Sequence, residues 1–336
     1  MENIRFIDLF AGIGGTRIGF EQAGAQCVFS SERDRFAQRT YATNFGEIPA
    51  GDIGDIDASK IPDHDILLAG FPCQPFSLAG IPVHKYLETQ GGFGNPDQGN
   101  MFFETMRILD RHEPDAFLLE NVKNLESHDK KKTFAIITET LRSRGYHFVH
   151  KIIDAADFVP QHRERIYIVG FKNPAAFAKF KWPDITPPAP PPRMSDILEA
   201  SVDRKYVVPE GTWLSLQRHA ERHRLLGNGF GYGIAKRDGI SRTLTARYYK
   251  DGAEILIQRP GPGRPRRLTP RECARLMGFP EEFEIPVSNT QAYRQFGNSV
   301  VVPVIREIAL MMMKALVGRK PRVKSWKPTN QFPLEI

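Results

Sequence analysis

The sequence predicts an α/β protein whose central sheet is mostly parallel and covered by helices on both faces. Two observations lead to this fold class. Short apolar runs alternate with longer segments of helical periodicity from residue 4 to about 180, which is typical of repeated βαβ units. A glycine cluster at residues 12–15 marks the junction of the first strand and the first helix, where such folds need a tight turn.

The alternation assigns the elements of the first half in order. Apolar runs bounded by polar residues are predicted strands, and amphipathic segments that end near glycine are predicted helices. The expected strands are 4–10, 26–32, 65–71, 115–122 and 164–171. The expected helices are 16–24, 34–45, 100–112 and 132–146.

A proline run from Pro183 to Pro192 interrupts this order, because proline is excluded from helix interiors and central strands. We read it as a linker between a large domain and a smaller, irregular, β-rich one that is dense in glycine, arginine and aromatic residues. From Asn289 a single long amphipathic helix is expected to return to the large domain. The predicted divisions are 1–185, 186–287, 288–318 and a partly ordered tail at 319–336.

Composition narrows the class of protein. The 336 residues are 41% hydrophobic, carry a formal net charge of +7, and contain neither a signal-peptide pattern nor a long apolar run, so we expect a soluble, cytoplasmic protein without a membrane span. Its three cysteines are widely spaced and include no CxxC pair, which favours neither a disulfide framework nor a metal site. The positive charge is compatible with a polyanionic partner such as nucleic acid.

The first stretch that could carry chemistry is DLFAGIGG, residues 8–15. A tight βα turn alone would explain its glycines, but glycines also let a ligand approach the backbone near free helix N–H groups. The spacing is not the GxGxxG of a dinucleotide site, which argues against a dehydrogenase. Glu32, at the end of the second strand, is placed to accept hydrogen bonds from ribose hydroxyls, so an adenosine ligand without a diphosphate fits. Asp52 could reach the adenine or simply cap a helix.

The second is GFPCQPFS, residues 70–77, directly after the third strand. An isolated cysteine is more often a buried core residue, but the prolines around Cys73 fix its backbone beside the expected ligand edge and favour a nucleophilic thiol. Glu120 ends the next strand and could be an acid whose pKa is raised by burial. Arg163 and Arg165 precede the last strand, where alternation points both to one face, and they could bind a carbonyl oxygen or phosphate.

Two further regions could contact a substrate. The long glycine-containing segment that follows Cys73, up to Asn100, has the length of a functional loop and could close on a substrate as a lid. In the smaller domain, arginines crowd between Arg259 and Arg275; they could be a solvated face, but beside flexible loops they suit phosphate contacts and base reading.

Together these stretches resemble the DNA (cytosine-5)-methyltransferases. DLFAGIGG, GFPCQPFS, ENVKN, QHRERIYIVGF, RPRRLTPRECARLMGFP and QAYRQFGNSVVVPV match the family's motifs in the family's order and cover nearly the whole chain. The resemblance implies a Rossmann-like S-adenosylmethionine domain, a target-recognition domain, and a cleft for double-stranded DNA. It implies that Cys73 is the nucleophile and that Glu120, Arg163 and Arg165 are the other catalytic residues.

The resemblance also implies binding residues. For the cofactor they are Phe10, Ala11, Gly12, Gly14, Gly15, Glu32, Arg33, Asp52, Ile53, Pro72, Asn298 and Ser299. For DNA they are Gln74, Ser77, Arg242, Thr243, Leu244, Arg247 and Tyr248. Arg33 departs from the family, which commonly has an aromatic residue there to stack on adenine; a guanidinium plane can stack as well, so we expect the cofactor to bind.

The smaller domain is similar to that of the bacterial Dcm group, which implies methylation of the inner cytosine of CCWGG or CCNGG. Under this hypothesis the protein is a nucleoid-associated bacterial monomer that can have a partner restriction endonuclease. Two alternatives share many of the same residues: a tRNA cytosine-5 methyltransferase on the same scaffold, and a catalytically silent DNA-binding protein. The arginine-rich second domain disfavours the first, and the intact Cys73, Glu120 and Arg165 disfavour the second.

Overall fold

The computed structural model describes residues 4–71, 101–183, 190–228, 231–318 and 323–329. Its strands are β1 (Arg5–Leu9), β2 (Gln26–Ser31), β3 (Ile66–Ala69), β4 (Ala116–Val122), β5 (His147–Asp154), β6 (Glu164–Phe171), β7 (Ile234–Ala235), β8 (Leu256–Ile257) and β9 (Arg266–Arg267). Its α-helices are α1 (Gly15–Gln22), α2 (Arg35–Phe45), α4 (Met101–His112), α5 (Lys132–Ser143), α6 (Pro174–Lys179), α7 (Glu210–Leu225), α8 (Pro270–Leu276), α9 (Asn289–Asn298) and α10 (Val302–Val317).

Six strands form one sheet in the order β2-β1-β3-β4-β6-β5, so the predicted α/β fold class is confirmed. The pairs among β2, β1, β3 and β4 are parallel, whereas β6 runs antiparallel to both β4 and β5. The start of β6 therefore lies at the same edge of the sheet as the carboxyl ends of the four parallel strands. In the register of the sheet, Arg165 is opposite Val122.

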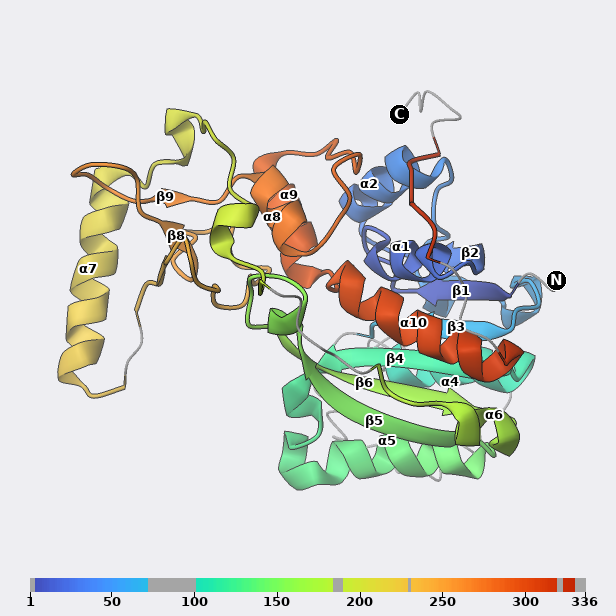
Figure 1. The fold of residues 1–336 in the computed structure, drawn as a ribbon. Helices are drawn as coiled ribbons and strands as arrows, with labels where there is room; N and C mark the ends of the chain where they lie inside the picture. The colour runs from blue at the N-terminus through green and yellow to red at the C-terminus, as the bar shows by residue number, and fades with distance from the viewer. Residues whose placement is uncertain (1–3, 72–100, 184–189, 229–230, 319–322, 330–336) are drawn as a thin grey trace.

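Helices cover both faces of this sheet, as Figure 1 shows. Successive residues of a strand point to opposite faces, so Phe6 of β1 lies in one apolar core with residues of α1 and α10, and Ile7 lies in a second core with residues of α4 and α5. Gly19 allows the close approach of α10 to α1, because a Cβ there would lie 2.6 Å from Ile305 Cγ2. The six-stranded sheet is thus supported by a packed layer on each face.

Four elements of the second half, β7, β8, β9 and α7, form a group apart from the large sheet. A three-stranded sheet, β7-β8-β9, and helix α7 lie to one side of the six-stranded sheet in Figure 1. Part of the expected tail lies along the other end of the molecule: Lys324 N donates to Gln22 O at 2.7 Å, and Trp326 Nε1 donates to Glu21 Oε2 at 3.0 Å. No helix among the described residues is long and apolar enough to cross a membrane.

Several elements differ from the predictions: one expected helix is divided, and β5, α6, α7 and α8 were not expected. The long helix expected after Asn289 is two helices, because in a continuous helix Pro303 would have no N–H to donate to the Ser299 carbonyl and its ring would clash with that carbonyl. The chain is extended at Ser299 (φ −72°, ψ 169°) and at Val301 (φ −83°, ψ 110°). Strand β5 was not predicted, since its polar residues hide the pattern of an edge strand that is buried on few positions. Helix α7 was also not predicted, because only Leu216 among its residues is buried and no apolar stripe marks it.

A strained turn lies between β4 and α5. Asp129, Lys130 and Lys131 all have positive φ, and Lys131 has φ 71° and ψ 1°, a left-handed geometry that costs a non-glycine residue roughly 1–2 kcal/mol. We expect Lys131→Gly to raise the free energy of unfolding by about 0.5–1 kcal/mol in urea denaturation, after the larger unfolded-state entropy of glycine is subtracted. Lys132→Gly is the control, because Lys132 is helical (φ −62°) and the same change there should not stabilise the protein.

Candidate active site

The chemistry-bearing residues gather where the parallel strands end. Glu120 lies near the end of β4, and the antiparallel direction of β6 brings Arg165 beside it. Arg165 Nε lies 3.2 Å from Glu120 Oε1, and each side chain is only 16% exposed. Glu120 was predicted at the end of one strand and Arg165 at the start of another. The two side chains meet because β6 runs antiparallel to β4.

Burial of Glu120 favours the protonated form of its carboxyl group. Burial raises the pKa of its carboxyl group above the ordinary value, while Arg165 and Arg163 act in the opposite direction. The carboxyl group also faces the chain that precedes Cys73, because a Cβ on Gly70 would lie 3.6 Å from Glu120 Oε2. A buried acid with a raised pKa, close to a strong cation, is suited to donating a proton to a substrate atom.

The chain that precedes Cys73 is held by a residue of β4. Asn121 is 4% exposed, and its Nδ2 donates to Phe71 O at 2.9 Å. Phe71 is the last described residue before Cys73; Pro72, Cys73, Gln74, Ser77 and the other residues up to Asn100 lie outside the described residues. The β4 residues Glu120 and Asn121 thus both contact the segment that precedes Cys73.

The two described cysteines are poor nucleophiles. Cys273 is fully buried, and burial raises its pKa well above the ordinary value. Burial also raises the pKa of Cys27 to about 12. Because the thiolate is the nucleophilic form, neither group is suited to covalent catalysis.

The glycine turn leaves an open backbone at the end of β1. Phe10 has φ 57°, a strained value for a side chain of this size, and Gly12 also has φ 57°. A Cβ on Gly12 would meet nothing within 4 Å, whereas Gly14 and Gly15 are packed closely against their neighbours. Ala11, between Phe10 and Gly12, is buried and donates from its N–H to Ser31 O at 2.9 Å. The turn is therefore held from β2 and open at Gly12.

Glu32 connects this turn to the end of β2. Its Oε2 accepts from Gly12 N at 2.9 Å, and its Oε1 accepts from Asp34 N at 2.7 Å. Burial raises the pKa of Glu32, and the backbone hydrogen bonds from Asp34 and Gly12 act in the opposite direction. The carboxylate is thus fixed beside the open glycine, as the resemblance implied for a ribose-binding acid.

The remaining cofactor candidates surround the same end of the sheet. Arg33 is 61% exposed, and its Nη1 lies 3.7 Å from Asp52 Oδ2, while Asp52 Oδ1 also caps the short helix that begins at the buried Ile53. A Cβ on Gly15 would lie 2.7 Å from Ser299 Oγ, so the segment between α9 and α10 meets the glycine turn. Asn298, at the end of α9, is exposed.

Comparison with known proteins decides the family. The profile described as C-5 cytosine-specific DNA methylase matches residues 4–314. The chain belongs to this family. It is 51% identical over 317 residues to the type II methyltransferase M.SsoII of Shigella sonnei, covering 93% of this chain and 80% of the relative. It is 48% identical over 363 residues to the DNA-cytosine methyltransferase of Escherichia coli, covering 92% of this chain and 77% of the relative.

A solved structure agrees with the fold of this methyltransferase. The crystal structure of S. pombe Dnmt2 methyltransferase has a TM-score of 0.73 and 23% sequence identity, and it covers 94% of this chain and 99% of that one. Since the identity is low, this likeness concerns the fold alone. The family and the relatives together show that the protein is an enzyme, a DNA (cytosine-5)-methyltransferase.

The residues of the second half that are expected to read DNA lie within or just after residues 241–245. We call residues 241–245 the recognition segment. Arg242 and Arg247 are exposed, and Thr243 is half-buried. Leu244 and Tyr248 are fully buried, and Tyr248 donates from its hydroxyl to Ile255 O at 2.6 Å and accepts from Leu268 N at 2.8 Å. The prediction that the Tyr248 and Leu244 side chains contact DNA is therefore wrong in this structure; they support the segment from within.

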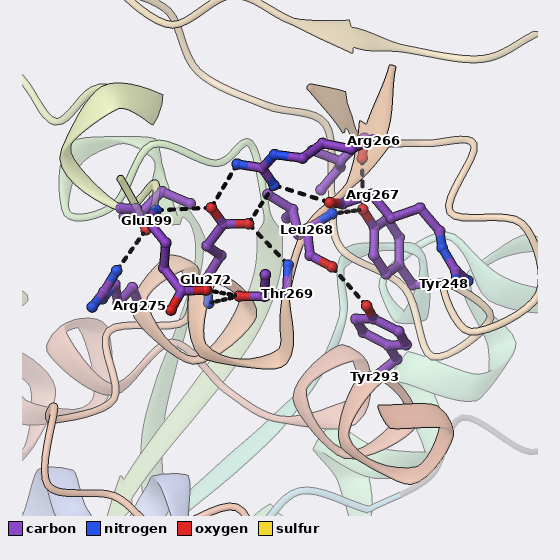
Figure 2. Close-up of polar contacts among 11 residues, drawn as sticks. Glu199, Tyr248, Arg266, Arg267, Leu268, Thr269, Glu272, Arg275 and Tyr293 are labelled. Carbon is purple, nitrogen blue, oxygen red and sulfur yellow. Dashed lines mark hydrogen bonds and ion pairs between the residues drawn. The ribbon is translucent and has the colours of Figure 1, made fainter. Parts of the chain in front are cut away.

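Some arginines of the cluster between Arg259 and Arg275 form ion pairs within the protein. Arg266 is 8% exposed and forms two hydrogen bonds to the fully buried Glu272, at 2.7 and 2.8 Å (Figure 2). Glu272 also accepts from the N–H groups of Thr269 and Glu199, each at 2.9 Å. Arg275 pairs with Glu281. The prediction of phosphate contacts is thus wrong for Arg266, which holds β9, α8 and the Glu199 loop together.

Glu272→Ala should destabilise the methyltransferase by about 3–5 kcal/mol, because it leaves the guanidinium of Arg266 buried and unpaired. Urea denaturation of the folded protein measures the change. Glu281→Ala is the matched control: Glu281 pairs with Arg275 at 2.6 Å but is 59% exposed, and exposed pairs contribute only about 0–1 kcal/mol. Equal losses for the two variants would contradict a structural role of the buried pair.

Proposed function

We propose that this enzyme transfers a methyl group from S-adenosylmethionine to C5 of a cytosine that is flipped out of duplex DNA, through a covalent bond between Cys73 and C6. The observation that carries the proposal is the Glu120–Arg165 pair, a buried acid with a raised pKa beside a cation, next to the chain at Gly70 that precedes Cys73. The high pKa values of Cys27 and Cys273 leave Cys73 as the suitable thiol.

The chemistry of cytosine requires such a nucleophile. C5 is too electron-poor to attack a methyl sulfonium, so the Cys73 thiolate first adds to C6, and the electron pair of the C5–C6 bond becomes available at C5. Protonated Glu120 donates to N3, and Arg165 holds the O2 carbonyl, which together stabilise the developing charge. When C5 has gained the methyl group, a base removes the C5 proton, the C5–C6 double bond forms again, and Cys73 leaves as thiolate.

The residues at the carboxyl ends of β1 and β2 fit the cofactor. The open space at Gly12 admits a ligand beside the backbone, and Glu32 can accept hydrogen bonds from ribose hydroxyls. Arg33 lies on the exposed side of this edge within ion-pair distance of Asp52, so its guanidinium can stack on adenine in place of the usual aromatic residue. S-adenosylmethionine supplies the electrophilic methyl group when it is bound.

We further propose that the enzyme reads CCWGG or CCNGG and methylates the inner cytosine, with Arg242 and Thr243 of the recognition segment, and Arg247 just after it, on the DNA side. C6 is unreachable in a stacked duplex, so the cytosine must be flipped, at a cost of a few kcal/mol. Gln74 and Ser77 belong to the loop that we expect to close on the DNA. The similarity to type II methyltransferases supports a partner restriction endonuclease that cleaves the same sequence when it is unmethylated.

Methylation mapping tests this function. DNA from a bacterial host that expresses the protein should carry 5-methylcytosine at the inner position of CCWGG or CCNGG, read by bisulfite or nanopore sequencing. The host should lack its own methyltransferase of this specificity. Methylation clustered in an unrelated motif would overturn the target, and methyl transfer to tRNA but not to duplex DNA by the purified protein would overturn the substrate.

A further inference from the structure

The recognition segment is attached to the chain that leads into β6. Gln161 and Ser241 form a parallel bridge, Ser241 N donates to Pro160 O at 2.8 Å, and His162 N donates to Ser241 O at 2.9 Å. Thr243 Oγ1 donates to His162 O at 2.6 Å. We call this pairing of residues 160–163 with residues 241–244 the seam. Because β6 begins at Glu164, the seam is continuous with the strand that carries Arg165.

The peptide groups of Leu244 are bound on both sides within the seam. Its N–H donates to Gln161 Oε1 at 2.7 Å, and its carbonyl accepts from Arg163 Nη1 at 2.8 Å. Arg163 Nη2 also donates to the carbonyls of Gly297 and Ser299, at 3.0 and 2.6 Å. These bonds lie where water is excluded, since Gln161 and Leu244 are fully buried and Arg163 is 2% exposed. In such surroundings a lost partner is costly.

Gln161 joins three parts of the molecule. Its Nε2 donates to Leu276 O of α8 at 3.2 Å while its Oε1 holds Leu244. Helix α9 closes the other side of the recognition segment, because a Cβ on Gly297 would lie 2.3 Å from the carbonyl carbon of Thr245. The segment is therefore confined between β6, α8 and α9 and cannot shift along the seam without breaking several of these contacts.

We propose that Gln161 is a positioning residue for sequence discrimination: through the Leu244 N–H it fixes the register of the recognition segment relative to Arg165 and Glu120. The inference rests on the proposed function, since it takes residues 241–245 to read DNA. Base reading and base flipping must occur at a set spacing on one duplex. A seam that continues directly into the catalytic strand holds that spacing, and a wrong base pair then cannot be accommodated by a small shift of the segment.

The test compares Gln161→Met with Gln295→Met. Gln295 is the matched control because it is also buried and also bridges elements, accepting from Thr40 Oγ1 at 2.9 Å and donating to Phe36 O at 2.8 Å, but it does not touch the seam. For each variant, kcat/KM is measured on a short duplex with CCAGG and on the same duplex with one base pair changed. If mapping identifies another site, duplexes with that site are used.

We expect Gln161→Met to lower the ratio of the two kcat/KM values by roughly five- to thirtyfold, within the range that one mismatched base pair controls. Gln295→Met should leave the ratio within about twofold, whatever it does to stability. Gln161→Glu keeps an acceptor for the Leu244 N–H but loses the Nε2 donor to Leu276 O, so it should restore only part of the discrimination. Hydrogen exchange of residues 241–246 should be faster in Gln161→Met and unchanged in Gln295→Met.

If Gln161→Met does not fold, Ser241→Ala serves as the second variant. It removes the hydrogen bond from Ser241 Oγ to Pro160 O, 3.1 Å long, and should lower the ratio in the same direction by a smaller factor. A rate that falls equally on both duplexes would show a merely structural role and overturn the inference. If the wild type methylates no duplex, the proposed function fails instead, and the exchange measurement still decides whether Gln161 fixes the segment.

Discussion

Replacing Cys73 with alanine should abolish methyl transfer, with a fall in kcat on the order of 10⁴-fold or more, as expected when the nucleophile of a covalent mechanism is removed. Without a bond at C6, C5 stays too electron-poor to accept the methyl group. DNA binding should be retained, because the thiol supplies chemistry rather than affinity. Transfer of labelled methyl groups from S-adenosylmethionine to duplex DNA, at equal amounts of folded protein, measures the loss.

Cys27→Ala and Cys273→Ala are the controls for this experiment. Neither thiol has the lowered pKa of a nucleophile, so both variants should transfer methyl groups at rates within a few-fold of the wild type, after correction for folded protein. Cys273 is fully buried and its variant will be less stable. Activity that survives in Cys73→Ala, or that disappears in Cys27→Ala, would contradict the assignment of the nucleophile.

Replacing Glu120 with glutamine should lower kcat by about 10²- to 10⁴-fold, the usual contribution of a general acid. Glutamine keeps the size and a hydrogen-bond donor but cannot transfer a proton to N3. The pH dependence adds a second readout. Burial raises the pKa of Glu120, so the carboxyl group keeps its proton to higher pH than an exposed glutamate does and loses it as the pH rises through that raised value.

The wild-type rate should therefore fall on the alkaline side of its pH profile, and Glu120→Gln should lack this fall. The same sign applies to stability: the protonated carboxyl group is tolerated in its buried site, and ionisation at higher pH costs folding free energy. Glu164→Gln is the control, because Glu164 begins the same strand β6 but pairs with Lys123 at the surface. An identical alkaline limb in Glu120→Gln and wild type would contradict the role as acid.

Hydrophobic periodicity was sufficient to predict five of the six strands of the large sheet. Strands that are buried on both faces, such as Ile66–Ala69, form short continuous apolar runs. Between amphipathic helices, such runs predict strands of a parallel sheet. Strand β5 and helix α7 were missed because each is largely exposed, so tertiary contacts rather than an apolar pattern determine them. The break before Pro303 could have been predicted from the proline alone.

Some residues of the site could be predicted from the sequence and others could not. Glu120 could be placed at the end of a predicted strand and Arg165 at the start of another, but their pairing depends on the antiparallel direction of β6, which the expectation of a mostly parallel sheet did not include. In the sequence, Gln161 is marked only by its place two residues before Arg163. Its role depends on the hydrogen bond from the Leu244 N–H, and Leu244 is far away in the sequence. The Arg266–Glu272 pair had a partial signal in the Thr269 to Glu272 capping box, but the buried ion pair depends on tertiary packing.

Covalent trapping tests the central claim most directly. A duplex in which 5-fluorocytosine replaces the inner cytosine of CCAGG is incubated with the enzyme and S-adenosylmethionine. Because fluorine cannot leave C5 as the proton does, elimination is blocked and the enzyme should remain bound to the DNA after denaturation. We predict a complex that carries one methyl group, with the DNA attached to Cys73 in peptide mass mapping. The absence of a stable complex, or attachment at Cys27 or Cys273, would contradict the mechanism.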